Sequence, residues 1–227
     1  MSLRIVKLGG SLLDFPGVAE RLRGWLAAQP AAATLLVVGG GRLADAIRQA
    51  QAVHAFDDAA AHRLCLDVMA VTAALACELV SEAKLARRPD EIDRTASGGV
   101  QVVDVREFLA ASVDPLPESW QVTSDSIAAH LAIFLEAEEL VLLKSTLPKS
   151  ELPKLSDSPD ALAAHGMVDD YFPQAVKALL TGAARRAGGD ARVRLVNLRD
   201  PRFAEVAVLE TPAATLRPSA SSAIENA

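Results

Sequence analysis

Two stretches of this chain each combine a short apolar run, a group of glycines and a helical pattern. The first is "LRIVKLGGSLLD", from Leu3 to Asp14, and the second is "TLLVVGGGRLADAIRQA", which begins at Thr34. The continuous run from Thr34 to Val38 is typical of a strand buried on both faces of a parallel sheet. The repeated order of strand, glycine turn and helix predicts a doubly wound α/β sheet with ligands at the carboxyl ends of its strands.

The first glycine turn follows a lysine. Lys7 lies near the end of an otherwise apolar strand, where its ammonium group is costly to bury without an anionic partner. Gly9 and Gly10 have no side chains, so an external group can approach the backbone N–H donors of the turn. A cation beside bare amides suggests a phosphate site. The alternative is a strand that ends in a surface lysine and a flexible turn.

The rest of the chain continues this alternation. Helices are expected over Phe15–Ala28, after Gly41, over Asp58–Lys84 with Asp57 or Asp58 as the N-cap, and from about Ser124 to Glu136. Strands are expected at Val100–Val103, at Leu140–Leu143 ending in Lys144, and in "RVRLVNL". We expect residues 1–217 to form a single domain and the Ser/Ala-rich residues 218–227 to be a disordered tail.

Composition limits the partners. The formal charge of −6 is spread without a basic block, which argues against nucleic acid. There is no secretory signal, the apolar runs are too short or too interrupted for a bilayer, and two cysteines imply no disulfide framework, so we expect a cytoplasmic protein without a membrane partner. The helix from Asp58 is apolar around much of its surface, which predicts a homo-oligomer. His54 and His62 lack further ligands at metal spacing, so no metal site is predicted.

Neither glycine segment matches the P-loop or the dinucleotide-binding pattern. The sequence instead resembles the amino acid kinase family, which includes acetylglutamate, aspartate, uridylate and isopentenyl phosphate kinases. The resemblance rests on "KLGGS" at Lys7–Ser11, "VVGGG" at Val37–Gly41 and "TSDSIAAHLA" at Thr123–Ala132, and it covers the chain from Leu3 to about Leu209. It implies a three-layer αβα sandwich with a mainly parallel central sheet, and a kinase that uses ATP and Mg²⁺.

The resemblance also implies roles for individual residues. Lys7 would contact the transferred phosphoryl group, and Asp125 would orient the active-site lysines, with Lys144 as the second cation. The nucleotide would be bound by Gly9, Gly10, Ser11, Ser145, Thr146 and Lys149, and the acceptor by Gly39, Gly40, Gly41, Ser124, Trp120 and Asp169. A valine in place of Gly40 should then block acceptor binding and leave the fold intact.

The second cation departs from the family pattern. Many members carry a later "GGMxxK", whereas this chain has "KST" at Lys144 and "HGMVDDYFPQAVK", which ends at Lys177. Lys144 is the better candidate because it ends a buried strand at the sheet edge, while Lys177 lies in the middle of an amphipathic helix. Lys149 and Lys154 lie in a Pro, Lys and Ser-rich loop that could close over a nucleotide.

The segments "WQVTSDSIAAHLA" and "GMVDDYFP" are similar to one branch of the family. This branch contains the small kinases of methanofuran biosynthesis, which convert an aminomethylfuran methyl phosphate into its diphosphate. Three assignments stay open. Trp120 either stacks on a flat acceptor ring or packs in the core. Asp169 either binds an acceptor ammonium group or caps a helix near Tyr171. Asp125 either orients the lysines or is only a carboxylate that the dipole of its helix stabilises. The rival function is a non-catalytic nucleotide or small-molecule-binding protein, because the later lysine motif is missing.

Overall fold

The computed structural model describes residues 2–95, 98–146, 158–181 and 191–210. Within these residues, seven strands form one sheet in the order β3-β4-β2-β1-β5-β6-β7. The strands are β1 (Leu3–Leu8), β2 (Ala33–Val38), β3 (Lys84–Ala86), β4 (Val100–Val103), β5 (Glu139–Lys144), β6 (Arg192–Asn197) and β7 (Glu205–Glu210). All pairs are parallel except β6 with β7. The predicted tail, Lys149 and Lys154 lie outside the described residues.

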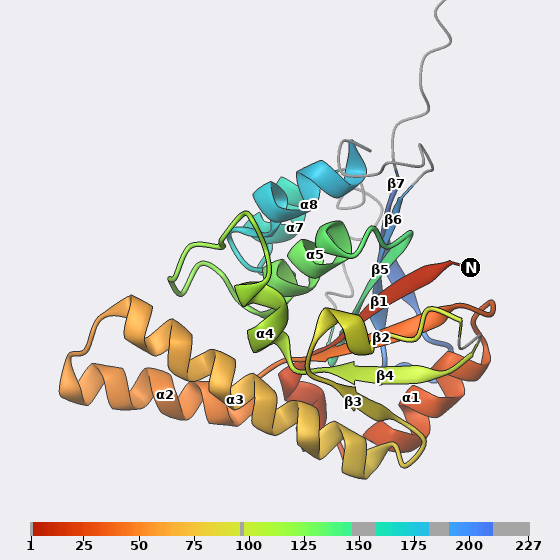
Figure 1. Ribbon diagram of the computed structural model, residues 1–227, viewed down its shortest axis with the longest axis horizontal. Coiled ribbons are helices and arrows are strands. Elements are labelled where there is room, and N and C mark those ends of the chain that lie inside the picture. The colour runs from red at the N-terminus through yellow and green to blue at the C-terminus, as the bar shows by residue number, and fades with distance from the viewer. Residues whose placement is uncertain (1, 96–97, 147–157, 182–190, 211–227) are drawn as a thin grey trace, which may run out of the picture.

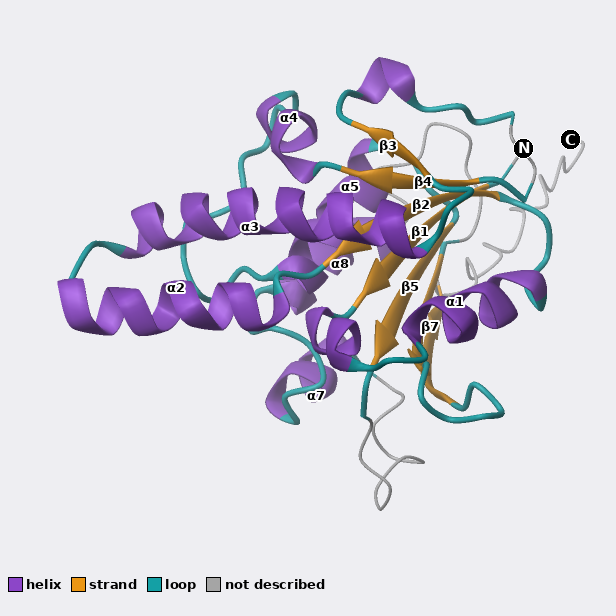
Figure 2. Cartoon of the chain, turned by 90° about the horizontal axis from the view of Figure 1, so that it is seen from below, coloured by secondary structure: helices purple, strands orange, loops and turns teal. Residues whose placement is uncertain are grey.

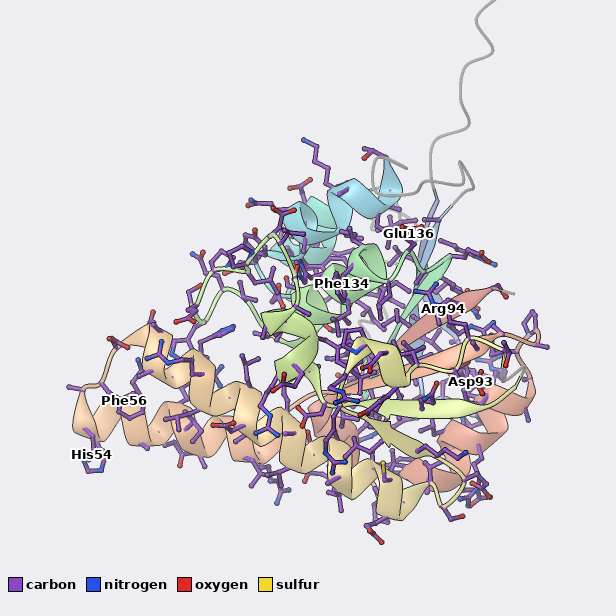
Figure 3. All side chains as sticks on the ribbon, viewed as in Figure 1. His54, Phe56, Asp93, Arg94, Phe134 and Glu136 are labelled. Carbon is purple, nitrogen blue, oxygen red and sulfur yellow. The ribbon has the colours of Figure 1, made fainter. Side chains whose placement is uncertain are left out.

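Helices cover both faces of the sheet, which confirms the αβα sandwich (Figure 1). On one face pack α4 (Val105–Ala110), α5 (Ser124–Phe134), α7 (Pro159–Ala164) and α8 (Phe172–Leu180). On the other face pack α1 (Val18–Ala27) and the second half of α3 (Asp58–Leu79). Helix α2 (Gly41–His54) lies beside α3, and the two extend beyond the sheet as a hairpin (Figure 2). His54 and Phe56 mark the far tip of this hairpin (Figure 3).

The alternation of side chains along a strand decides where the lysines point. In β1, Ile5 joins the apolar core under α5, whereas Val6 joins the core under α1. Lys7 follows the alternation and lies on the side of Ile5. In β5, Leu142 also belongs to the core under α5, so Lys144 lies on that side too. Both lysines therefore reach the same face of the sheet, at the carboxyl ends of neighbouring strands.

The connections of β1 and β5 leave the sheet in opposite directions. Strand β1 leads to β2 on one side and β5 leads to β6 on the other, although β1 and β5 are neighbours. Ligands of open α/β sheets bind in the crevice outside the carboxyl ends of the strands at such a point. The topology thus places the expected ligand site beside the ends of β1 and β5.

The long helix α3 is shorter than the sequence pattern predicts. It ends at Leu79, because the backbone of Val80 leaves the helical region, with φ −121° and ψ 85°, and buries its side chain in the core under α1. Lys84, expected in the helix, begins the edge strand β3. At the other end Asp57 is the N-cap, and its carboxylate accepts a hydrogen bond from Ala60 N at 2.7 Å.

Helix α3 bears on the expectation that the apolar runs are too short or too interrupted to cross a bilayer. Among the described residues it is the one helix with the necessary length and composition, with a mean hydropathy of 1.4. This is weak support for a membrane span, because a core helix of a soluble protein passes the same test. Ala61 and Ala73 are buried, whereas Leu64, Val71 and Leu75 are exposed.

Candidate active site

Three charged side chains meet where β1 and β5 end. Lys7 Nζ lies 2.9 Å from Asp125 Oδ1, and Lys144 Nζ donates a hydrogen bond to Asp125 Oδ2 at 2.6 Å. The lysines come from the two strands, and Asp125 comes from the first turn of α5. The Lys7 contact is an ion pair without hydrogen-bond alignment, since Oδ1 accepts no hydrogen bond from the described residues. The structure therefore brings together the three residues expected to be catalytic.

Burial and charge act in opposite directions on Asp125. Burial by itself would raise the pKa of this carboxyl, but the ammonium groups of Lys7 and Lys144 lower the pKa of Asp125 to about 2. Burial lowers the pKa of Lys144; the charge of Asp125 opposes this shift, and the charge of Lys7 adds to it. Asp125 is therefore an anion at neutral pH, and it is suited to orient the lysines rather than to accept a proton.

The lysine cluster carries excess positive charge. Among the described residues, Asp125 is the only carboxylate in ion-pair contact with either lysine. The charge of Asp169 acts on Lys144 without such a contact, because its oxygens accept hydrogen bonds from Thr123 and Ser126. Near the amino ends of β1 and β5, by contrast, Arg4 and Arg194 pair with two carboxylates, Glu139 and Glu205, so those charges balance. A buried cation without a counter-ion is costly. The imbalance beside β1 and β5 therefore indicates an anionic ligand.

Asp169 has a structural role that differs from both interpretations of the sequence. Its Oδ2 accepts hydrogen bonds from Thr123 N at 2.9 Å, Thr123 Oγ1 at 2.7 Å and Ser126 N at 3.1 Å, and its Oδ1 accepts one from the Ser126 hydroxyl. It thus caps α5, not the helix that begins after Tyr171, which has no side-chain cap. Because both of its oxygens are engaged with α5, Asp169 fixes the turn that carries Asp125.

The two glycine turns pack directly against each other. A Cβ atom on Gly10 would lie 2.1 Å from the amide nitrogen of Gly41, and one on Gly41 would lie 2.6 Å from the carbonyl oxygen of Gly10. Gly41 also has a φ of +55°, which side chains rarely tolerate. Gly39 is close to Ser124, whose Oγ would be 2.8 Å from a Cβ at position 39. Because these glycines have no side chains, the ends of β1 and β2 and the start of α5 can approach one another closely.

Gly40 corrects an expectation from the sequence. A Cβ atom there would lie 2.8 Å from the Cβ of Ala44 and 3.0 Å from Cγ1 of Val68. Although Gly40 borders a cavity, this Cβ would enter the packing between α2 and α3. A valine at this position would disturb the helix pair, so it cannot block the acceptor while leaving the fold intact.

Two cavities flank the glycine turns, and Gly10 and Ser11 line both of them. The first, which we call the lysine cavity, has a volume of about 480 Å³. It is lined by Lys7, Gly9, Gly10, Ser11, Lys144, Ser145, Thr146 and residues 165–167. The second, the tryptophan cavity, has a volume of about 190 Å³ and lies among the start of α2, α3 and the start of α5. Of the residues predicted to bind the acceptor, Gly40, Gly41, Trp120 and Ser124 line this cavity.

The lysine cavity suits a polyphosphate. Two ammonium groups supply charge, while the hydroxyl oxygens of Ser11 and Ser145, 2.8 Å apart, and that of Thr146 supply hydrogen bonds. No three His, Cys, Asp or Glu side chains of the described residues are grouped to hold a metal ion. A magnesium ion fits here as one coordinated mainly by nucleotide phosphates, which is its usual mode. Lys177 is exposed on α8 and does not line this cavity.

Trp120 lines the tryptophan cavity and is fixed by α2. Its Nε1 donates a hydrogen bond to Gln51 Oε1 at 2.6 Å, and the Arg48 guanidinium lies over the ring, 4.3 Å from its centroid. One face and the polar edge of the indole are therefore occupied by protein. A flat ligand can stack only on the other face.

Sequence reasoning missed much of the tryptophan cavity. Asp45, Arg48, His62, Met69 and Ile127 also line it. Asp45 and Arg48 follow the glycine turn at the spacing of one helix face, a signal that the sequence contains. His62 and Met69 share a face of α3 in the same way, but nothing local shows that this face borders a cavity.

Comparisons with known proteins agree with this fold. The sequence profile of the amino acid kinase family matches residues 2–146. The chain belongs to the amino acid kinase family. Its fold resembles that of uridylate kinase from Archaeoglobus fulgidus, with a TM-score of 0.60 and 16% identity over 92% of this chain and 99% of that one. Family membership indicates a phosphotransferase that uses ATP.

Two further solved structures share the fold. UMP kinase from Bacillus anthracis has a TM-score of 0.56 and 12% identity, covering 93% of this chain and 97% of that one. Aspartate kinase from Synechocystis has a TM-score of 0.57 and 14% identity, covering 95% of this chain but 41% of that one. No curated protein sequence matches the chain. At these identities the likeness shows the fold alone.

Proposed function

We propose that the protein transfers the γ-phosphoryl group of Mg²⁺-bound ATP to the phosphate group of a small acceptor. The supporting observation is that two cavities share Gly10 and Ser11, while the excess positive charge lies in only one of them. The nucleotide occupies the lysine cavity and the acceptor occupies the tryptophan cavity. Their phosphates then meet at the shared glycine turn.

The reaction needs positioning and charge more than proton transfer. An oxygen of the acceptor phosphate forms the new bond to the γ-phosphorus, and the bond to ADP breaks. Charge on the transferred group is stabilised by Lys7 and Lys144, whose ammonium groups Asp125 holds in place. A phosphate acceptor is already ionised, so no general base is required. This agrees with the low pKa of Asp125, about 2, which leaves it unable to accept a proton at neutral pH.

We further propose that the acceptor is an aminomethylfuran methyl phosphate of methanofuran-type cofactor biosynthesis. The volume of about 190 Å³ is below the roughly 300 Å³ of most drug-sized ligand pockets, which favours a small acceptor. Leu66, Met69 and Ile127 offer apolar walls for a flat ring. A dicarboxylate acceptor is less suitable, because the one arginine in the lining, Arg48, is paired with Asp45 at 2.8 Å.

The test is ADP release from ATP in the presence of a panel of acceptors. The panel contains [5-(aminomethyl)furan-3-yl]methyl phosphate, UMP, aspartate and no acceptor, and mass spectrometry identifies the product. We expect ADP and a furan diphosphate in stoichiometric amounts. ADP release with UMP or aspartate alone would replace the furan by that acceptor. Tight ATP binding without ADP release from any mixture would favour the non-catalytic alternative.

We also propose that the enzyme is a cytoplasmic homo-oligomer. Leu64, Val71 and Leu75 recur on one face of α3 and are 41%, 58% and 43% exposed. A row of exposed large apolar residues on one helix favours contact with another protein surface. Light scattering should therefore report a mass above 23.9 kDa.

A further inference from the structure

The tryptophan cavity contains a histidine that the proposed phosphoryl transfer does not use. His62, in the second turn of α3, is only 7% exposed and lines this cavity. Its Nδ1 lies 3.3 Å from the carbonyl oxygen of Ser119. A carbonyl oxygen only accepts hydrogen bonds, so Nδ1 carries the proton. In the neutral ring, Nε2 is then a hydrogen-bond acceptor.

No described residue donates a hydrogen bond to His62 Nε2. The imidazole is also neutral at pH 7, because burial lowers its pKa; the Ser119 carbonyl and Glu118 oppose this shift and Arg63 adds to it. From α2, Asp45 and Arg48 line the same cavity and pair with each other. His62 therefore offers the cavity an unused acceptor on a buried, neutral ring.

The position of His62 along α3 defines which part of a ligand it meets. Val68 lies beside Gly40 at the glycine turn, where the acceptor phosphate is proposed to bind. His62 precedes Val68 by nearly two helical turns, roughly 9 Å along the axis, in the direction of the hairpin tip. Cys65 and Leu66 line the stretch between, and Met69 lines the cavity just after Val68. The cavity thus has a phosphate end, an apolar middle and a hydrogen-bond-accepting end.

We propose that His62 is a specificity-determining residue, whose Nε2 accepts a hydrogen bond from an ammonium group at the end of the acceptor remote from the transferred phosphoryl group. This inference rests on the proposed function and names the acceptor class: a phosphate monoester with a flat apolar middle and a cationic end. Asp45 and Arg48 line the same cavity as an ion pair, so together they add no net charge that would repel the ammonium group. A purely structural His62 would only tie α3 to the segment that contains Ser119.

The test compares two ligands that differ only at the remote end. These are [5-(aminomethyl)furan-3-yl]methyl phosphate and (5-methylfuran-3-yl)methyl phosphate, and their binding is measured by calorimetry without turnover. The parent should prefer the ammonium compound by about 10- to 100-fold, as expected for a hydrogen bond to a charged group. His62→Leu should lose this preference with little change in affinity for the methyl compound. His62→Gln, which keeps an acceptor oxygen, should retain part of it.

The pH profile of the parent protein gives an independent readout that needs no variant. Protonation makes Nε2 a donor and gives the ring a positive charge that faces the ligand ammonium. The phosphate group of both ligands also titrates at about pH 6, so the readout is the ratio of the two affinities. This ratio should decline as pH falls below 6.5 through the lowered pKa of His62. If thermal unfolding shows that His62→Leu is poorly folded, the preference measured with His62→Gln and the pH profile of the parent test the role of His62 instead.

The outcomes separate the two claims. A parent without preference, a pH-independent preference, or an unchanged preference in His62→Leu would each overturn the role of His62. Tight, His62-dependent binding with no ADP release from ATP would overturn the proposed kinase function but support the role of His62. Failure of the parent to bind either compound would overturn the furan acceptor and the role of His62, while ADP release with the other acceptors of the panel would still decide the kinase function.

Discussion

Replacing Lys144 with methionine tests the charge cluster most directly. Methionine keeps most of the side-chain stem and removes the ammonium group that contacts Asp125 at 2.6 Å. A group aimed at charge that develops in the transition state typically contributes about 2.7–4 kcal/mol. Turnover should therefore fall by roughly a hundredfold to a thousandfold. ATP binding should change less, because the lost stabilisation is greater in the transition state than in the ground state.

The same substitution should not destabilise the fold. The pKa of Lys144 is lowered, chiefly by burial, so the folded state binds this proton less tightly than the unfolded chain does. The free energy of unfolding of the parent should thus rise with pH between the lowered pKa and the ordinary value of 10.5. Lys144→Met removes this dependence and the cost of burying the charge. Asp125 retains Lys7 as its counter-ion.

The measurements are single-turnover ADP formation with the furan phosphate acceptor and thermal unfolding near pH 7 and pH 9. Lys177→Met is the matched control, because it makes the same chemical change on the exposed side of α8. The reasoning is refuted if Lys144→Met turns over like the parent while Lys177→Met is inactive. It also fails if Lys144→Met loses several degrees of Tm, since the cluster would then be mainly a structural ion pair.

Three further changes probe the same site and its surroundings. Asp125→Asn should lose roughly 2 kcal/mol of stability in urea at pH 7, because the pKa of Asp125 drops from 3.8 to about 2, and this difference should shrink as pH falls through that range. Its effect on turnover should overlap strongly with that of Lys7→Met. Gly10→Ala should weaken binding of ATP and of acceptor together by calorimetry, because its Cβ would lie 2.1 Å from Gly41 N. Val71→Glu should reduce the mass seen by light scattering; a parent already monomeric at micromolar concentration would contradict the oligomer.

Much of the sheet and the meeting of the two lysines could be predicted from local patterns, while the place of Asp125 came from the family resemblance. Mainly apolar runs at Leu3–Leu8, Thr34–Val38 and Val100–Val103 marked strands that the structure contains within one residue. Lys7 and Lys144 were conspicuous because each interrupts or ends an apolar strand. Parallel strands bring their carboxyl ends to one edge, so the meeting of the lysines followed from the fold class.

Features that depend on distant contacts could not be predicted. Strand β3 has only three residues, too few for a periodic signal. The antiparallel strand β7 was not predicted, although Val206–Leu209 is a short apolar run. Asp169 caps α5 through Ser126, a partner 43 positions away, so the sequence near Asp169 suggested the wrong helix. The role of Gly40 depended on Val68, which reaches it only because α2 and α3 form a hairpin.

The arrangement around Asp125 also explains why the cluster is better suited to binding than to folding. Asp169 holds the first turn of α5, that turn holds Asp125, and Asp125 contacts both lysines. One lysine would be enough to neutralise Asp125, and a second buried cation costs desolvation that the fold must offset. The surplus charge lies in a cavity that also presents hydroxyl groups and a glycine turn. A phosphoryl group in this cavity would supply the missing negative charge, so an unfavourable feature of the free protein would become the feature on which the proposed phosphoryl transfer depends.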